Sequence, residues 1–311
     1  MTNPSLTEDI TLHQAIAKGD MKAVQDLVLS GADIEEKNSR GQTLLYFAVA
    51  EYQIPIVEFL LQQGAKIDEA NRFGYTPLHF AVSQCHQPMV EILIKNGANI
   101  EAKCDVQSRT PLHIASLRGH LEIIQMLITK GAKIDTKDIN GYESLHNAAQ
   151  LGQNRTLELL LQKGANIDSR NNSGFTPIHT AASARQIRTI EILLQNGANI
   201  ETQNDLGRTP LHTAVHNWSY NGSLKKTVEI LIQNGAKIDA KDVHGQTPIQ
   251  LAICCKQSSM VQILLRYGAS LKIRNQDGFT PLEVALILDV FSWNLEKKVN
   301  LIKFLTYSGM M

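Results

Sequence analysis

The chain has 311 residues with 30 basic and 30 acidic side chains, so its formal net charge is zero. This balance argues against a protein that binds nucleic acid or a membrane surface through strong basic charge. Hydrophobic residues make up 43% of the chain, which is enough for a continuous core and unlike a disordered protein. Residues 1–70 nevertheless carry 11 acidic and 5 basic side chains. That acidic end either steers a basic partner or reflects drift in surface composition.

The beginning of the chain and its cysteines indicate where the protein works. The first segment is polar and acidic, without the apolar core of a signal peptide, and no apolar run reaches membrane-spanning length. The four cysteines, Cys85, Cys104, Cys254 and Cys255, form no CxxC pair. Free thiols fit a reducing compartment. We therefore expect a cytoplasmic protein.

One six-residue pattern recurs along the chain. Its clear copies are TPLHFA, TPLHIA, TPIHTA, TPLHTA, TPIQLA and TPLEVA, which begin at Thr76, Thr110, Thr176, Thr209, Thr247 and Thr280. Weaker copies, ITLHQA, TLLYFA and ESLHNA, begin at Ile10, Thr43 and Glu143. The spacings between successive copies are 33, 33, 34, 33, 33, 33, 38 and 33 residues. The pattern therefore marks nine repeats.

Each copy predicts the start of a first helix. Threonine is a preferred N-cap, and proline fits the first helical position because its missing N–H costs nothing there. A histidine follows two residues after the proline position, and we expect it to form structural hydrogen bonds at the helix start. These histidines are His13, His79, His113, His146, His179 and His212.

A second helix follows in each repeat. Residues 89–97, MVEILIKNG, show the typical spacing, with apolar side chains on one helical face. The segment ends at a glycine, which predicts a left-handed helix cap. The next residues, of the form A-x-I-D/E, are predicted to be extended and to lead into a polar finger.

The repeat length and the opening motif make the chain resemble the ankyrin-repeat family. The resemblance implies a mainly α fold, a solenoid of helix pairs with projecting β-hairpin fingers. It covers nearly the whole chain and implies a single domain of residues 1–311. The approximate repeats are 5–37, 38–70, 71–104, 105–137, 138–170, 171–203, 204–241, 242–274 and 275–311.

Motifs for catalysis or cofactor binding are missing from the sequence. Histidines one repeat apart lie roughly 10 Å from each other, which is too far to share a metal ion. The chain contains no GxxxxGK[ST], GxSxG or GxGxxG motif. We therefore expect a non-enzymatic protein with no catalytic residues, no metal and no cofactor.

The resemblance implies a concave face made of finger tips and first helices. The residue just before each pattern lies on this face, and in repeats 3 to 7 it is aromatic or arginine. Such residues dominate binding hot spots. We expect these five, called the stripe, to bind a protein partner, although their rings could instead only shield the fingers. The stripe consists of Tyr75, Arg109, Tyr142, Phe175 and Arg208.

Two insertions mark a second candidate surface. Repeats 7 and 9 carry extra residues between their helices, and these segments hold both tryptophans of the chain. Insertions in repeat arrays often carry function. We expect either a second partner-binding edge or rings that pack on their own helices. The residues concerned are Trp218, Tyr220, Phe291 and Trp293.

Three further features of the repeats predict local properties. Seven fingers carry a carboxylate after A-x-I, which forms either a surface for a basic partner or a solvated finger. These are Glu35, Asp68, Glu101, Asp135, Asp168, Glu201 and Asp239. Repeat 4 has an extra finger residue and Ser108 in place of glycine, so its tip should differ. Repeat 5 has Glu143 and Ser144 in place of Thr-Pro, which predicts a weaker helix start and local opening there.

The sequence thus predicts a monomeric scaffold or adaptor that binds a protein partner, with no nucleic acid and no membrane. Two alternatives stay open. The chain could inhibit a partner enzyme by masking its active site. It could also be a bacterial effector that binds host proteins in the host cytosol.

Overall fold

The computed structural model describes residues 11–104, 107–216 and 223–287. Within these residues the chain forms helix pairs, as predicted. The helices are α1 (Leu12–Lys18), α2 (Met21–Leu29), α3 (Leu44–Ala50), α4 (Ile54–Gln62), α5 (Pro77–Ser83), α6 (Gln87–Lys95), α7 (Pro111–Arg118), α8 (Leu121–Thr129), α9 (Ser144–Leu151), α10 (Asn154–Gln162), α11 (Pro177–Ala184), α12 (Ile187–Gln195), α13 (Pro210–His216), α14 (Ser223–Gln233), α15 (Pro248–Cys254), α16 (Ser258–Arg266) and α17 (Pro281–Ile287).

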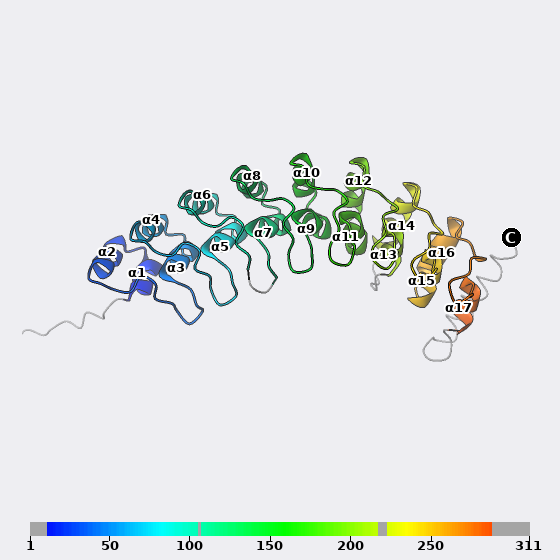
Figure 1. The fold of residues 1–311 in the computed structure, drawn as a ribbon, viewed down its shortest axis with the longest axis horizontal. Helices are drawn as coiled ribbons and strands as arrows, with labels where there is room; N and C mark the ends of the chain where they lie inside the picture. Colours follow the sequence, from blue (N-terminus) through cyan, green and yellow to red (C-terminus); the bar gives the residue numbers. More distant parts are fainter. Residues whose placement is uncertain (1–10, 105–106, 217–222, 288–311) are drawn as a thin grey trace, which may run out of the picture. The chain divides into compact units, whose positions relative to one another are not determined.

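The chain divides into two compact units, Met1–Ser144 and Leu145–Met311. In the N-terminal unit the first helices α1, α3, α5 and α7 lie side by side, and the second helices α2, α4, α6 and α8 form another row (Figure 1). Finger loops project from the first helices. Leu78, Leu93 and Ile124 are among the fully buried side chains between the rows.

The C-terminal unit repeats this arrangement. First helices α11, α13, α15 and α17 pack on their neighbours in sequence, and second helices α10, α12, α14 and α16 do the same. Ile178, Leu193 and Leu211 are fully buried. A single repeat has too little apolar surface to bury by itself, so this continuous core along each unit stabilises its members together.

The Thr-Pro motif starts first helices as predicted. In repeat 3, Thr76 is the N-cap of α5 and Pro77 is the first helical residue. The Thr76 hydroxyl accepts a hydrogen bond from the main-chain N–H of His79, and Nδ1 of His79 accepts one from the N–H of Thr76. This reciprocal pair satisfies two N–H groups that a helix start otherwise leaves open.

The first repeat departs from this scheme. Thr11, which aligns with the proline position, is the N-cap of α1, so the helix begins one residue late. Gln14 therefore closes the capping box, with hydrogen bonds of 3.0 and 3.2 Å to Thr11. The prediction that His13 bonds at this helix start is wrong. Its Nε2 is buried without a hydrogen-bond partner among the described residues.

Second helices end at left-handed glycines, as predicted. Gly97, for example, follows α6 with a φ of 90°. The turn between first and second helices also needs a positive φ. Glycine supplies it at Gly19 and Gly119, whereas Cys85 and Arg185 adopt φ values of 57° and 60° despite their side chains.

The fingers differ from the expected extended segments. The A-x-I-D/E segment forms a turn, as shown by the hydrogen bond of 3.1 Å from the N–H of Ala102 to the carbonyl of Asn99. A second tight turn forms the tip, where the N–H of Gly74 donates to the carbonyl of Asn71 at 2.9 Å. Among the described residues only Lys37 and Thr43 form an isolated β-bridge. The fingers are therefore hairpin-shaped loops without an extended ladder.

The finger of repeat 4 has the predicted different tip. The N–H of Cys104 bonds to the carbonyl of Arg109 across one more residue than in repeat 3. Ser108 takes the left-handed conformation, with a φ of 51°. The residues of the second candidate surface, Trp218, Tyr220, Phe291 and Trp293, lie outside the described residues.

Candidate functional site

The five stripe residues occupy equivalent places. Each one directly precedes the N-cap position of a first helix, and each side chain is half-buried. Tyr75, Arg109 and Tyr142 belong to the N-terminal unit, and Phe175 and Arg208 to the C-terminal unit.

Histidines of the preceding repeat form hydrogen bonds with the main-chain carbonyl groups of stripe residues. Nε2 of His113 lies 3.0 Å from the carbonyl oxygen of Tyr142, and Nε2 of His179 lies 2.8 Å from that of Arg208. Nδ1 of each ring accepts an N–H from the threonine N-cap, so the ring proton is on Nε2 and donates to the carbonyl. The predicted structural role of these histidines is confirmed, and it extends to the following repeat.

The N–H groups of the stripe are also bonded. The N–H of Tyr142 donates to Oδ1 of Asp138 at 2.9 Å, and that of Arg208 donates to Oδ1 of Asn204 at 3.0 Å. Both main-chain polar groups of these stripe residues are therefore fixed by neighbouring side chains. Their side chains project from a rigid backbone.

Burial keeps the bonded histidines neutral. It lowers the pKa of His79 and of His179 from 6.5 to about 4, and the bonds to carbonyl oxygens offset only part of this effect. Burial also lowers the pKa of His113 and His212. A neutral ring with its proton on Nε2 is the state that these hydrogen bonds require.

The aromatic stripe residues pack on this framework through ring edges. The ring centroids of Tyr75 and His79 are 5.7 Å apart at an interplanar angle of 70°. Those of Phe175 and His179 are 5.5 Å apart at 60°. The contact covers part of each ring and leaves both side chains partly exposed.

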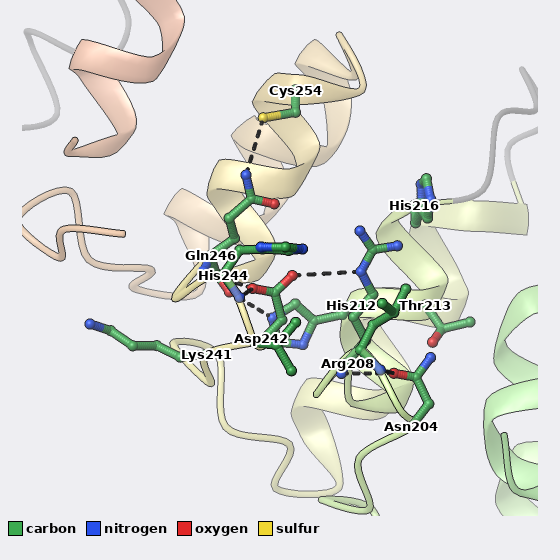
Figure 2. A network of polar contacts seen from close by, with 12 residues as sticks. Asn204, Arg208, His212, Thr213, His216, Lys241, Asp242, His244, Gln246 and Cys254 are labelled. Atoms are coloured by element: carbon green, nitrogen blue, oxygen red, sulfur yellow. Dashed lines mark hydrogen bonds and ion pairs between the residues drawn. The ribbon is translucent and has the colours of Figure 1, made fainter. Parts of the chain in front are cut away.

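Each stripe arginine faces an aspartate of the next repeat. Nε of Arg109 is 3.7 Å from Oδ2 of Asp138, and Nε of Arg208 is 3.6 Å from Oδ2 of Asp242 (Figure 2). Both aspartate side chains are buried, at 2% and 0% exposed. These aspartates were not among the candidate residues predicted from the sequence. Their signal was present, because they stand where most repeats have asparagine.

The finger carboxylates have a structural use. Oε1 of Glu101 accepts the main-chain N–H of Lys133 in the next repeat at 2.9 Å, and its Oε2 accepts the hydroxyl of Thr136. Five other carboxylates accept the equivalent N–H, namely Glu35, Asp68, Asp168, Glu201 and Asp239. These bonds link successive fingers, a role that neither the surface for a basic partner nor the solvated finger had included.

The remaining chemistry-bearing groups in the described part of the chain include its cysteines. The four cysteines are free thiols, and Sγ of Cys255 lies 3.6 Å from Nδ1 of His216. Among the described residues, no cluster of three or more His, Cys, Asp or Glu side chains could hold a metal ion. The same residues include no helix that is long and apolar enough to cross a membrane.

The fold and this regular site define a helical repeat protein. A comparison with protein families matches the family described as ankyrin repeats (3 copies) over residues 12–104, 101–171, 145–242 and 215–308. The chain belongs to the ankyrin-repeat family. Ankyrin repeats are general protein–protein interaction modules, and the family is typically non-enzymatic. A comparison with individual curated proteins gave no match.

Proposed function

We propose that the chain is a non-enzymatic scaffold or adaptor that binds a protein partner through its stripe residues. Its family membership supports protein binding in general. The free thiols fit a reducing cytoplasm, and the proposal places a monomer of the chain there.

The observation that carries the proposal is the fixed backbone of the stripe. The carbonyls of Arg109, Tyr142, Phe175 and Arg208 each accept a histidine Nε2–H within 3.0 Å. A partner that binds here does not have to order this backbone, so less of the contact energy is lost to conformational entropy. Half-buried aromatic and arginine side chains on a rigid support are the typical anchors of protein interfaces.

Affinity capture from cell lysate, followed by mass spectrometry, tests the proposal. The stripe variant changes Tyr75, Tyr142 and Phe175 to alanine. It also replaces both arginines by glutamine and their partners Asp138 and Asp242 by asparagine, because an arginine change alone would leave a buried aspartate unpaired. We expect this variant to lose the proteins that the wild-type chain captures.

A control variant changes aromatic and arginine residues in, or directly after, second helices to alanine. These are Phe59, Arg155, Arg188, Arg266 and Tyr267, all at least partly exposed. Circular dichroism verifies that both variants fold. The proposal requires capture to survive in the control. Equal capture by the stripe variant and the wild-type chain would overturn it.

A further inference from the structure

Arg208 is held at one end by the next repeat. Its Nε is buried and faces Oδ2 of Asp242 at 3.6 Å. Oδ1 of this aspartate accepts the main-chain N–H groups of His244 and Gln246, both at 2.9 Å. The carboxylate is therefore fixed by the finger turn, and its charge attracts the inner end of the guanidinium, although Nε and Oδ2 do not form a hydrogen bond.

The outer edge of the same guanidinium forms no hydrogen bond with the described residues, and His216 lies on that side (Figure 2). No described residue accepts a hydrogen bond from Nη1 or Nη2 of Arg208, and the side chain keeps 16% of its surface exposed although Nε is buried. In Figure 2 the two Nη atoms point away from Asp242. A guanidinium fork of this kind pairs with a carboxylate through two parallel hydrogen bonds.

The pairing with aspartate follows the arginine along the sequence. Arg109 and Arg208 are followed in the next repeat by Asp138 and Asp242. Other repeats have glutamine, tyrosine or phenylalanine at the position of Arg208. In four of these the following repeat has asparagine at the position of Asp242, and the exception is Tyr75, which is followed by Cys104 in the irregular finger of repeat 4. The four pairs are Gln42 with Asn71, Tyr142 with Asn171, Phe175 with Asn204 and Gln246 with Asn275.

The finger turn itself does not need the negative charge. Oδ1 of Asn204 accepts the N–H groups of Leu206 and Arg208 at 3.0 Å each, as Oδ1 of Asp242 does one repeat later. The charge of Asp242 therefore serves the arginine. It favours one orientation of the guanidinium through the ion pair.

The C-terminal unit has a positive net charge, and the fingers next to Arg208 expose apolar side chains. Residues 145–311 carry 17 basic and 12 acidic side chains, a net charge of +5. The adjoining finger tips expose Leu206 and Val243, at 46% and 45%, and these two residues are joined by a main-chain hydrogen bond of 3.0 Å. Lys241 on the following finger is exposed as well, whereas Arg274 pairs with Glu283 at 2.9 Å and the exposed Asp205 pairs with Arg170 at 2.8 Å.

We infer that Arg208 binds a glutamate or aspartate side chain of an acidic peptide segment in the partner, while Leu206 and Val243 contact an apolar residue beside it. The inference rests on the proposed function and specifies the partner class for the C-terminal unit. The carboxylate takes the two outer N–H groups of the guanidinium, and Asp242 keeps the inner end in place.

Fluorescence anisotropy with a short fluorescein-labelled peptide rich in glutamate and leucine tests this inference on the full chain. The variant Arg208→Gln with Asp242→Asn reproduces the natural Gln246 and Asn275 pair and leaves the net charge unchanged. We expect it to weaken binding by at least about tenfold. Arg208→Lys keeps the charge but lacks the fork, and it should also weaken binding.

A matched control removes another ion pair without changing the net charge. Arg188 and Glu191 form an exposed pair at 3.1 Å on α12, and changing both to glutamine should leave the affinity as it is. A peptide with glutamine in place of glutamate should bind the wild-type chain more weakly.

Equal affinity of the wild-type chain and the Arg208→Gln, Asp242→Asn variant for the glutamate peptide would overturn the inference. So would equal affinity of the wild-type chain for the glutamate and glutamine peptides. Either result would leave the proposed function standing if the stripe variant still lost its captured partner.

Discussion

Gln250 of repeat 8 occupies the position that His179 occupies in repeat 6. Its Oε1 accepts the N–H of Thr247 at 2.9 Å, and its Nε2 donates to the carbonyl of Phe279 at 2.8 Å. These are the two bonds that the histidine makes. A carboxamide therefore links two repeats as the imidazole does, but it does not titrate.

This substitution predicts a change in acid sensitivity. The folded pKa of His79 and His179 is about 4, below the usual value near 6.5, so the unfolded chain binds more protons between these two values. The contribution of these neutral histidines to the free energy of unfolding is fully present above about pH 6.5. It is lost progressively as the pH drops toward 4. Each such histidine contributes a slope of up to about 1.4 kcal/mol per pH unit.

The double variant His79→Gln, His179→Gln should show a shallower loss of stability between pH 6.5 and 4, with little change at pH 7.5. Urea unfolding, monitored by circular dichroism at several pH values, measures the free energy of unfolding of the variant and of the wild-type chain. An unchanged pH dependence would show that these rings do not control acid sensitivity.

Arg208 and Asp242 predict a strongly non-additive pair. Arg208→Gln alone leaves a buried unpaired carboxylate and should lower the free energy of unfolding by about 3 kcal/mol. Asp242→Asn alone keeps the turn acceptor and should cost less than about 1 kcal/mol. The double variant should return to within about 1 kcal/mol of the wild-type chain. A double-mutant cycle by urea unfolding measures this, and additive losses would contradict the pairing.

At the scale of elements, α9 has the least typical start. It begins at Ser144 after Glu143, whereas α11 begins at Pro177 after a threonine N-cap. Proline and threonine both favour a helix start, so we predict that α9 opens first. Hydrogen exchange should show faster exchange of α9 amides than of α11 amides. Equal protection of the two helices would contradict the prediction.

Local signals made most of the elements predictable. Threonine, proline and glycine act within one or two turns of helix, so the starts of most first helices and the ends of second helices followed from the sequence. The error at His13 has a local cause as well, because the alignment placed the pattern at Ile10 while Thr11 is the residue that can cap. The turn in each A-x-I-D/E segment was missed, since apolar and polar residues alternate there as they do in a strand.

Contacts between repeats were harder to predict. The bond from His113 to the carbonyl of Tyr142 joins residues 29 positions apart, and no periodicity of a single repeat shows it. The pairing of Arg208 with Asp242 could have been found by comparing adjacent repeats. It requires reading two positions together rather than each one alone.

At the scale of the whole chain, the repeats have the same helix-pair structure but differ in the charge of their side chains. Residues 1–144 have 13 basic and 18 acidic side chains, a net charge of −5, while residues 145–311 have +5. The stripe residues of the two units therefore belong to segments of opposite net charge. The single domain of residues 1–311 stays a prediction, and so does the partner edge at Trp218, Tyr220, Phe291 and Trp293.

The central claim is that the stripe binds a protein partner. Titration calorimetry of the captured partner tests it most directly, with the wild-type chain, the stripe variant and the second-helix control compared at one salt concentration. The claim predicts that the stripe variant raises the dissociation constant by at least about 100-fold, since several anchors are lost, and that the control stays within about twofold. Equal dissociation constants for the wild-type chain and the stripe variant would contradict it.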